Sequence, residues 1–333
     1  MMALRRLLWR SAFWLIIIWL ILEFCSYIAL RGVDVETIFI PRDDLMPFNP
    51  QTLWSFEPNS SFELDGIAYQ IDEYGMRATV DSKEDDGILF VGDSSAFGLG
   101  VESNDSLSEQ TARCSGLKAR NAGVSGYSTY QIQQVLPSRM AQFQPRVVVL
   151  VVPWSDLMHA SIDDVNRLKR ARWVFSMQQL MKTPVIRSSW VIRFFVHTAQ
   201  KNIKSNPINL DPNSVLHAKV RGQHRRVVSA EHVEYIKEIH HIVEQNDAEL
   251  VIVQLPINRK YPSPPSSVIK AYREPVKRWS TEQNLPLVDG EKMYQIRSKT
   301  DPEEWFVDAV HPNAIGYQHL AKEICVVLAS KID

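Results

Sequence analysis

The chain has 333 residues and a formal net charge of −1, with 45% hydrophobic and 23% charged residues. These proportions are ordinary for a folded globular protein, and the length suits one large domain or two small ones. The near-zero net charge gives no reason to expect nucleic acid as a partner. The three cysteines, Cys25, Cys114 and Cys325, match no zinc or redox spacing, so we predict no metal site built on cysteine.

The first informative segment is an apolar run over residues 11–30, which follows three arginines within the first ten residues. A run of about 20 such residues can cross a bilayer as a helix. Asp34 and Glu36 follow the run, so the positive-inside bias predicts a cytoplasmic N-terminus and a body outside the cytoplasm, periplasmic or extracellular. We therefore interpret residues 1–31 as a cytoplasmic tip and a single-pass transmembrane signal anchor.

A cleaved signal peptide and a lipoprotein signal are the alternatives to an anchor. Residues 12–22 would form the apolar core of a signal peptide, but Tyr27 stands where a cleavage site needs a small residue. Phe24 is too large to precede a lipidated Cys25. An uncleaved anchor is therefore favoured, although it places Glu23 in hydrocarbon, where a charge is costly. We expect Glu23 either to lie at a helix–helix contact or to be protonated.

Residues 32–86 are predicted to form a stalk or lead-in to the following domain. They are rich in Pro, Asp, Asn and Ser, and no helical period runs through them. Short strand-like pieces lie at 61–64 and 67–71.

From residue 87 onward, short apolar runs alternate with helix-like stretches. The runs lie at 88–91, 147–152 and 250–253, with weaker ones at 117–120 and 285–288. Continuous apolar runs of this length indicate strands buried on both faces, as in a parallel sheet. The helix-like stretches are 106–113, 129–141, 232–244, 266–282 and 314–330. This alternation predicts an α/β sandwich with right-handed crossovers, in which a site forms at the carboxyl ends of the strands.

Residues 157–229 interrupt the alternation and are interpreted as a basic, mostly helical insertion. From 165 to 226 the chain has thirteen Lys or Arg and one acidic residue, Asp211, and the stretch 185–196 is apolar and aromatic. Two interpretations stay open at this point. The basic residues are either the solvated face of a helical cap, or a surface that touches anionic lipid headgroups or an anionic glycan.

The first motif whose residues could take part in catalysis is Gly92-Asp93-Ser94-Ser95, between the first strand and a helix. A serine at a strand's carboxyl end and a helix N-terminus places backbone N–H groups and the helix dipole beside any oxyanion that forms there. Taken alone, the tripeptide Gly-Asp-Ser is common and equally describes a turn with a helix cap.

The second motif is Asp308-Ala309-Val310-His311, before the last helix. A serine hydroxyl is a weak nucleophile until a base takes its proton, and histidine is the natural base near neutral pH. The base needs a carboxylate to hold its tautomer and orientation. An Asp and a His three residues apart can meet that need, although a buried His and a capping Asp would give the same pattern.

Together the two motifs resemble the SGNH hydrolases, also called the GDSL esterase/lipase family. The resemblance covers residues 87–330, interrupted by the insertion. It implies a three-layer α/β/α sandwich with a mostly parallel, flavodoxin-like sheet, here preceded by the N-terminal transmembrane helix. It also implies a carboxylic ester hydrolase with Ser94 as nucleophile, His311 as base and Asp308 as the orienting carboxylate. The family's chemistry implies no metal and no organic cofactor.

The resemblance extends to the blocks that supply oxyanion donors, with one departure. Asn121-Ala122-Gly123-Val124-Ser125-Gly126 matches the first block, so the N–H of Gly126 would join that of Ser94 in the oxyanion hole. The second block is usually Gly-x-Asn-Asp, but here it is Pro153-Trp154-Ser155-Asp156. Ser155 therefore stands where the family has an asparagine donor. Loss of one such donor can cost roughly a hundred- to a thousandfold in turnover, so weak or lost activity remains an alternative.

Three further sets of residues carry predictions of their own. Cys114 and Cys325 fall on the first and last helices of the α/β core, which often lie side by side in folds of this winding, and we hypothesise a disulfide between them. The alternative is two buried free thiols. His240 and His241 lie on a charged helix and are interpreted as a solvated face, not a metal site. Trp154 either stacks on a sugar ring or belongs to the core.

The function predicted from the sequence is an extracytoplasmic serine esterase that hydrolyses an O-acyl ester on an envelope or exported glycan or on a lipid. A glycan O-acyltransferase on the same fold is an alternative with the same chemistry. A non-catalytic envelope component that binds polysaccharide or a partner protein is the alternative from another class. The sequence carries no signal for the oligomeric state.

Overall fold

The computed structural model describes residues 2–32, 45–79, 87–160, 162–181, 183, 188–204, 224–261, 263–297 and 305–332. The chain divides into two compact units. One comprises Met1–Arg42 with Lys169–Asn209, and the other comprises Asp43–Leu168 with Leu210–Asp333. The second unit holds the sheet and every residue of the motifs above.

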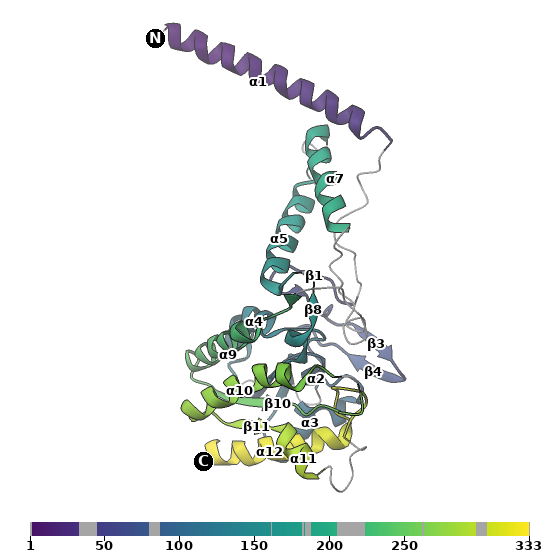
Figure 1. The fold of residues 1–333 in the computed structure, drawn as a ribbon, viewed down its shortest axis with the longest axis vertical. Coiled ribbons are helices and arrows are strands. Elements are labelled where there is room, and N and C mark those ends of the chain that lie inside the picture. Colours follow the sequence, from purple (N-terminus) through teal and green to yellow (C-terminus); the bar gives the residue numbers. More distant parts are fainter. Residues whose placement is uncertain are drawn as a thin grey trace. The chain divides into compact units, whose positions relative to one another are not determined.

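A five-stranded, fully parallel sheet forms the centre of the second unit (Figure 1). Its strands run in the order β11-β10-β7-β5-β6, which is the flavodoxin-like order that the family resemblance implies. The apolar runs form these strands because both faces of the sheet are covered: all residues of β5 and β7 are buried. The strands are β5 (Ile88–Val91), β6 (Ala119–Asn121), β7 (Val147–Val151), β10 (Glu249–Gln254) and β11 (Leu287–Asp289).

Helices cover both faces of the sheet, so the predicted three-layer α/β/α sandwich is confirmed (Figure 1). Helices α3 and α12 pack against each other on one face, and α4, α9 and α10 pack together on the other. The helices begin where the sequence offers caps: Ser128 and Gln131 form a capping box at the start of α4. These five helices are α3 (Leu107–Ser115), α4 (Thr129–Phe143), α9 (Ser229–Glu244), α10 (Ser266–Glu282) and α12 (Ala314–Ile332).

Shorter elements complete this unit. The sequence predicted no helix between the last strand and residue 314, but a short helix begins directly after β11. The short helices are α2 (Ser94–Phe97), η1 (Ser103–Asp105), η2 (Trp154–Leu157) and α11 (Gly290–Arg297), and β8 (His159–Ala160) pairs with β9 (His224–Arg225).

A disulfide between Cys114 and Cys325 joins α3 to α12, as hypothesised. Their Cα atoms lie 6.2 Å apart although 211 residues separate them in the chain. The pairing follows from the winding, which places the first and last helices of the core side by side.

Residues 45–79, predicted from the sequence to be part of the lead-in, belong to the unit that contains the sheet. They form β1 (Phe48–Asn49), β2 (Leu53–Trp54), β3 (Ser61–Leu64) and β4 (Ile67–Gln70). The last two contain the strand-like pieces noted in the sequence, and they pair antiparallel. Arg77 is 2% exposed, and its guanidinium donates to the carbonyls of Phe97, Gly98 and Val101 at 2.6–2.7 Å. This part of the lead-in therefore holds the loop that follows α2.

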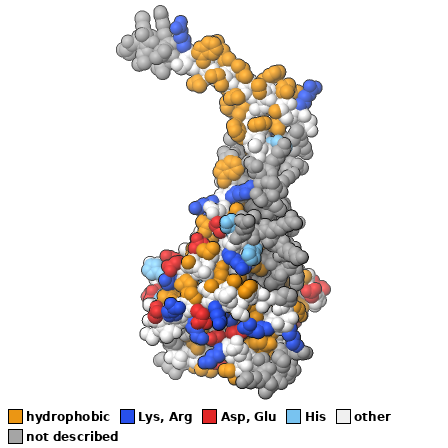
Figure 2. Space-filling view, in the orientation of Figure 1, with side chains coloured by type: hydrophobic (Ala, Val, Ile, Leu, Met, Phe, Trp, Pro, Cys, Tyr) orange, Lys and Arg blue, Asp and Glu red, His pale blue; other side chains and the backbone are white. Residues whose placement is uncertain are grey.

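The first unit contains α1 (Met2–Ala29), α7 (Trp190–Lys204) and most of α5 (Asp164–Met181). Trp9–Ala29 is long and apolar enough to cross a membrane, and its projecting side chains are mainly hydrophobic (Figure 2). Glu23 lies at a contact between the helices α1 and α7. A helix–helix contact was one of the two expectations for this residue. Its carboxylate accepts hydrogen bonds from Ser189 Oγ (2.5 Å) and from the N–H of Trp190 (2.6 Å), so it caps the N-terminus of α7.

The described parts of the insertion are mainly helical, but two of its arginines depart from both interpretations of the basic residues. Arg167 and Arg226 are 8% and 4% exposed, so neither is a solvated or ligand-facing cation. Arg226 forms a buried ion pair with Asp164 (2.7 Å). A charge enters a protein interior when such a partner and further hydrogen bonds compensate the lost hydration.

Candidate active site

The turn between β5 and α2 presents Ser94 at the carboxyl edge of the sheet. Gly92 is needed there because a Cβ would lie 2.6 Å from Cβ of Ala96 and 2.7 Å from the carbonyl oxygen of Val151. Asp93 is the N-cap of α2, and its Oδ1 accepts a hydrogen bond from the N–H of Ser95 (3.0 Å). Ser94 is thus the first residue of the helix, with backbone N–H groups around it.

Asp93 also ties this turn to the neighbouring strand. Its Oδ2 accepts hydrogen bonds from the N–H of Trp154 (2.9 Å) and from Ser155 Oγ (3.2 Å), both in η2 after β7. Asp93 is 2% exposed. Burial raises its pKa, and the N–H and hydroxyl groups around it offset only part of that effect. Asp93 therefore positions two candidate blocks against each other, a role that the sequence analysis did not assign.

Ser94, His311 and Asp308 lie in hydrogen-bond contact. Ser94 Oγ is 2.7 Å from His311 Nε2, and His311 Nδ1 is 2.6 Å from Asp308 Oδ2. Ser94 and His311 are 217 residues apart in the chain, yet they lie in contact. With Asp308 they form the arrangement expected of a nucleophile, a base and an orienting carboxylate. His311 is 3% exposed.

The loop that carries His311 is organised around Asp308. Asp308 Oδ1 accepts hydrogen bonds from the N–H groups of Val310 and His311, both at 2.9 Å. Burial raises the pKa of Asp308, but the hydrogen bonds and the charge of His311 outweigh it and lower the pKa to about 2. Asp308 is therefore ionised near neutral pH and accepts the Nδ1–H of His311, which leaves the Nε2 lone pair of the neutral ring facing Ser94 Oγ.

Gly126 follows β6 and adopts a backbone conformation that favours glycine. Its φ is +77°, and a Cβ would lie 3.3 Å from the ring of Trp54. The carbonyl of Gly126 accepts a hydrogen bond from Arg226 Nη1 (2.6 Å). Within the described residues, the N–H groups of Ser94 and Gly126 donate to no protein acceptor. Both N–H groups therefore lack a hydrogen-bond partner within the described part of the protein.

The hydroxyl of Ser155, in contrast, already has a hydrogen-bond partner. Its hydroxyl, which has a single proton, donates to Asp93 Oδ2 at 3.2 Å. The residue is also 3% exposed. The structure thus directs Ser155 to the buried carboxylate instead of leaving its hydroxyl free for an oxyanion.

No group of three or more His, Cys, Asp or Glu side chains suited to a metal ion occurs among the described residues. On α9, His240 lies 3.8 Å from Glu244, and His241 is hydrogen-bonded to Gln245 at 2.9 Å.

A comparison with protein families matches residues 90–319 to the GDSL-like Lipase/Acylhydrolase family. The chain belongs to this family. The resemblance on which the fold and the enzyme class were predicted is therefore confirmed, and the GDSL-like chain is a carboxylic ester hydrolase.

Three of the solved structures that are similar to this chain are named as lipolytic proteins or esterases. A lipase/acylhydrolase from Enterococcus faecalis is 16% identical with a TM-score of 0.48, covering 74% of this chain and 96% of its own. A member of the lipolytic protein G-D-S-L family from Veillonella parvula is 13% identical with a TM-score of 0.46, covering 73% and 97%. An acetyl-xylooligosaccharide esterase from Geobacillus is 15% identical with a TM-score of 0.45, covering 74% and 94%. A search of curated proteins found no match.

Proposed function

We propose that this chain is a membrane-anchored serine esterase that cleaves O-acyl esters outside the cytoplasm, with Ser94, His311 and Asp308 as its triad. The observation that carries the proposal is the continuous pair of contacts, Ser94 Oγ to His311 Nε2 at 2.7 Å and His311 Nδ1 to Asp308 Oδ2 at 2.6 Å. The family's chemistry agrees with it.

In the proposed reaction, Ser94 Oγ attacks the ester carbonyl while His311 Nε2 takes the hydroxyl proton. The N–H groups of Ser94 and Gly126 stabilise the negative charge on the carbonyl oxygen. His311 then gives its proton to the leaving alcohol, and an acyl-enzyme remains. A water molecule attacks the acyl-enzyme with His311 again as base, which releases the acid and restores Ser94. Asp308 holds His311 in the required tautomer and balances its transient charge.

The proposed location rests on α1 and the residues around it. Arginines precede the span, and acidic residues follow it, so the domain would lie on the far side of the membrane from the N-terminus. The disulfide between α3 and α12 agrees with an oxidising compartment. Esters on envelope or exported glycans or on lipids are the substrates that a tethered domain would meet there.

Hydrolysis of p-nitrophenyl acetate by the full-length chain in detergent tests the triad. Ser94→Ala should lower kcat by at least about a thousandfold, because the nucleophile is lost. Ser95→Ala is the matched control: the adjacent Ser95 is buried, and its hydroxyl has no partner among the described residues, so its loss should leave kcat within twofold. Equal turnover by Ser94→Ala and wild type would remove the assignment.

A further inference from the structure

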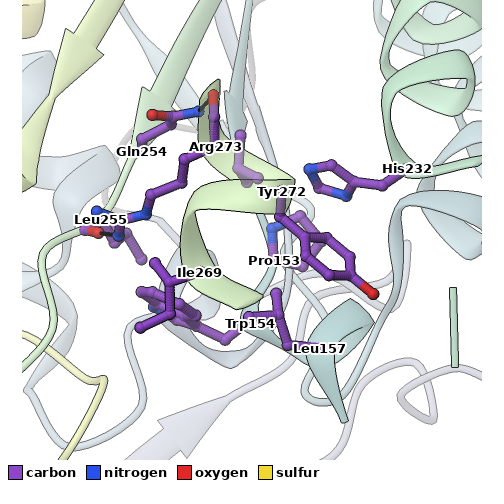
Figure 3. A pocket seen from close by; sticks show the side chains of 10 residues that line it. Pro153, Trp154, Leu157, His232, Gln254, Leu255, Ile269, Tyr272 and Arg273 are labelled. Carbon is purple, nitrogen blue, oxygen red and sulfur yellow. Dashed lines mark hydrogen bonds between the residues drawn. The ribbon is translucent and has the colours of Figure 1, made fainter. Parts of the chain in front are cut away.

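A small pocket lies between the segments that follow β7 and β10 and the helices α9 and α10 (Figure 3). It has room for about one water molecule, so no part of a substrate can enter it. Trp154 and His232 line this pocket, and their nitrogens Nε1 and Nε2, which have no partner among the described residues, are buried. The Trp154 ring packs against the hydrophobic core, which agrees with the expectation that this residue belongs to the core.

The first unit, in contrast, exposes large aromatic side chains on α7. Phe195 is 68% exposed and Phe194 is 39% exposed, and their ring centroids lie 6.3 Å apart. Covering these rings would remove a large apolar surface from water. Exposed apolar side chains that stand together can mark a contact with a partner molecule or with a membrane. Which of the two applies depends on where α7 lies in its unit.

Helix α7 is held against the last turns of α1, the proposed membrane anchor (Figure 1). Glu23 of α1 accepts hydrogen bonds from the residues that begin α7. The ring of Trp190 lies 5.0 Å from that of Tyr27, and Val196 packs with Leu30 in a buried cluster. The contacts therefore advance along both helices, over the first turns of α7 and the last turns of α1.

These contacts set the depth of α7 in a bilayer that α1 crosses. Glu23 stands just under two helical turns before Ala29, the last residue of the apolar span, which is a rise of about 9 Å. Amphipathic helices at a membrane surface bury their apolar face to a depth of about 5–10 Å. The first turns of α7 therefore lie at the depth of the membrane interface, where their outer faces meet the lipid that surrounds α1.

The sequence of α7 agrees with an interfacial position. Basic residues recur along this helix at intervals of four and three, which is the spacing of one helix face. They are Arg193, His197, Lys201 and Lys204. Basic residues on the polar face of an interfacial helix lie among the lipid headgroups, while aromatic and aliphatic residues enter the acyl chains. Phe194 and Phe195 fall outside the basic stripe, as such an arrangement requires.

We propose that α7 is a second membrane contact, with its first turns in the interface beside α1 and with Phe194 and Phe195 among the lipid acyl chains. Lipid is the partner because α1 already places this level of the unit in the bilayer. Glu23 agrees with this depth, since it supplies the acceptor that the first N–H groups of α7 need where water is scarce. The proposal rests on α1 as the anchor and is independent of the triad.

Spin labels on single cysteines measure this depth in the full-length chain, reconstituted into nanodiscs of phosphatidylcholine and phosphatidylglycerol. The background is Cys25→Ser, which removes the free thiol, while the native disulfide takes no label. Phe195→Cys carries the test label, and His197→Cys, on the basic stripe of the same helix, is the matched control. Molecular oxygen gathers among acyl chains, whereas the nickel complex of ethylenediaminediacetate stays in water. The ratio of oxygen to nickel accessibility should be at least about threefold higher at Phe195 than at His197.

Two further labels keep the result interpretable. Phe194→Cys repeats the test at the neighbouring ring and should also give a high ratio, and circular dichroism checks that each labelled chain keeps its helices. The native Cys25, exposed on α1 within the span, is the reference for the anchor itself. An oxygen-rich environment is expected at Cys25.

Three outcomes would overturn the proposal, and they are distinguishable. Equal ratios at Phe195 and His197, with an oxygen-rich Cys25, would reject the second contact and keep the anchor. A label at Phe195 that is shielded from both reagents would show a protein cover instead of lipid, and dipolar broadening between labels would identify that cover as a second copy of the chain. A Cys25 label that is open to the nickel complex would reject the anchor and the second contact together.

Discussion

The hydroxyl of Ser155 donates to the buried carboxylate of Asp93, at the place where the family's asparagine supplies an oxyanion donor. Two backbone donors, the N–H groups of Ser94 and Gly126, then remain for the proposed oxyanion hole. A site with one donor fewer is expected to be slower, since each donor can contribute roughly a hundred- to a thousandfold in turnover.

Two substitutions at this position test that interpretation. Ser155→Ala should change kcat on p-nitrophenyl acetate less than about fivefold, because the lost hydroxyl does not face the oxyanion. Ser155→Asn should raise kcat about tenfold or more, because its amide can extend past the carboxylate as an additional donor. A large loss of kcat in Ser155→Ala, with the fold intact by circular dichroism, would show that the serine already acts as a donor.

At the scale of elements, the two ends of the insertion hold the loop that carries Gly126. Asp164 begins α5, and Arg226 follows β9. Arg226 donates to the Gly126 carbonyl at 2.6 Å, to Gln131 Oε1 at 2.7 Å and to Asp164 Oδ2 at 2.7 Å. A buried ion pair therefore joins these two parts of the insertion and positions the loop that carries a candidate oxyanion donor.

Replacing Asp164 by Asn should destabilise the fold by about 3–5 kcal/mol at pH 7, because it leaves the buried charge of Arg226 without its partner. Burial raises the pKa of Asp164, but Arg226 and Arg167 outweigh it and hold the pKa below its ordinary value. A carboxyl of this kind contributes stability above its unfolded pKa of about 4 and loses it as pH falls through the folded pKa.

The difference in free energy of unfolding between wild type and Asp164→Asn should therefore be constant from about pH 7 to 5 and shrink below about pH 4. Urea unfolding at a series of pH values measures it. Asp163→Asn is the control, since Asp163 is partly exposed and an amide can still accept from the N–H of Asn166. A difference that is equally large at pH 3 and pH 7 would contradict the account.

At the scale of the whole molecule, the disulfide closes the sheet unit between its first and last helices. A cross-link that spans 211 residues restricts the unfolded chain and typically stabilises a domain by about 2–5 kcal/mol. Cys114→Ala combined with Cys325→Ala should therefore lower the thermal unfolding temperature. Cys25→Ser is the control, because Cys25 carries a free, exposed thiol, and its change should have no effect. Equal unfolding temperatures for all three chains would refute a stabilising bond.

The central strands β5, β7 and β10 were predictable because each holds an unbroken apolar run, whereas β6 and β11 are short and include polar residues. The five main helices were predictable because helix-like stretches alternate with these runs. The residues of the proposed triad stood out because two short sequence motifs contain them within a few positions. Arg77 and His232 gave no such signal. Arg77 binds backbone carbonyls 20 to 24 residues away, and His232 meets Asp156 across 76 positions. Contacts of this kind depend on tertiary packing, which no local pattern records.

Labelling by a fluorophosphonate probe tests the central claim most directly, because the probe reacts only with a serine activated by its neighbours. We expect labelling of the full-length wild-type chain, with the label on the peptide that contains Ser94. Labelling should be lost in both Ser94→Ala and His311→Ala and should be complete in Ser95→Ala. A well-folded wild-type chain that takes no label, or a label that persists in Ser94→Ala, would contradict the account.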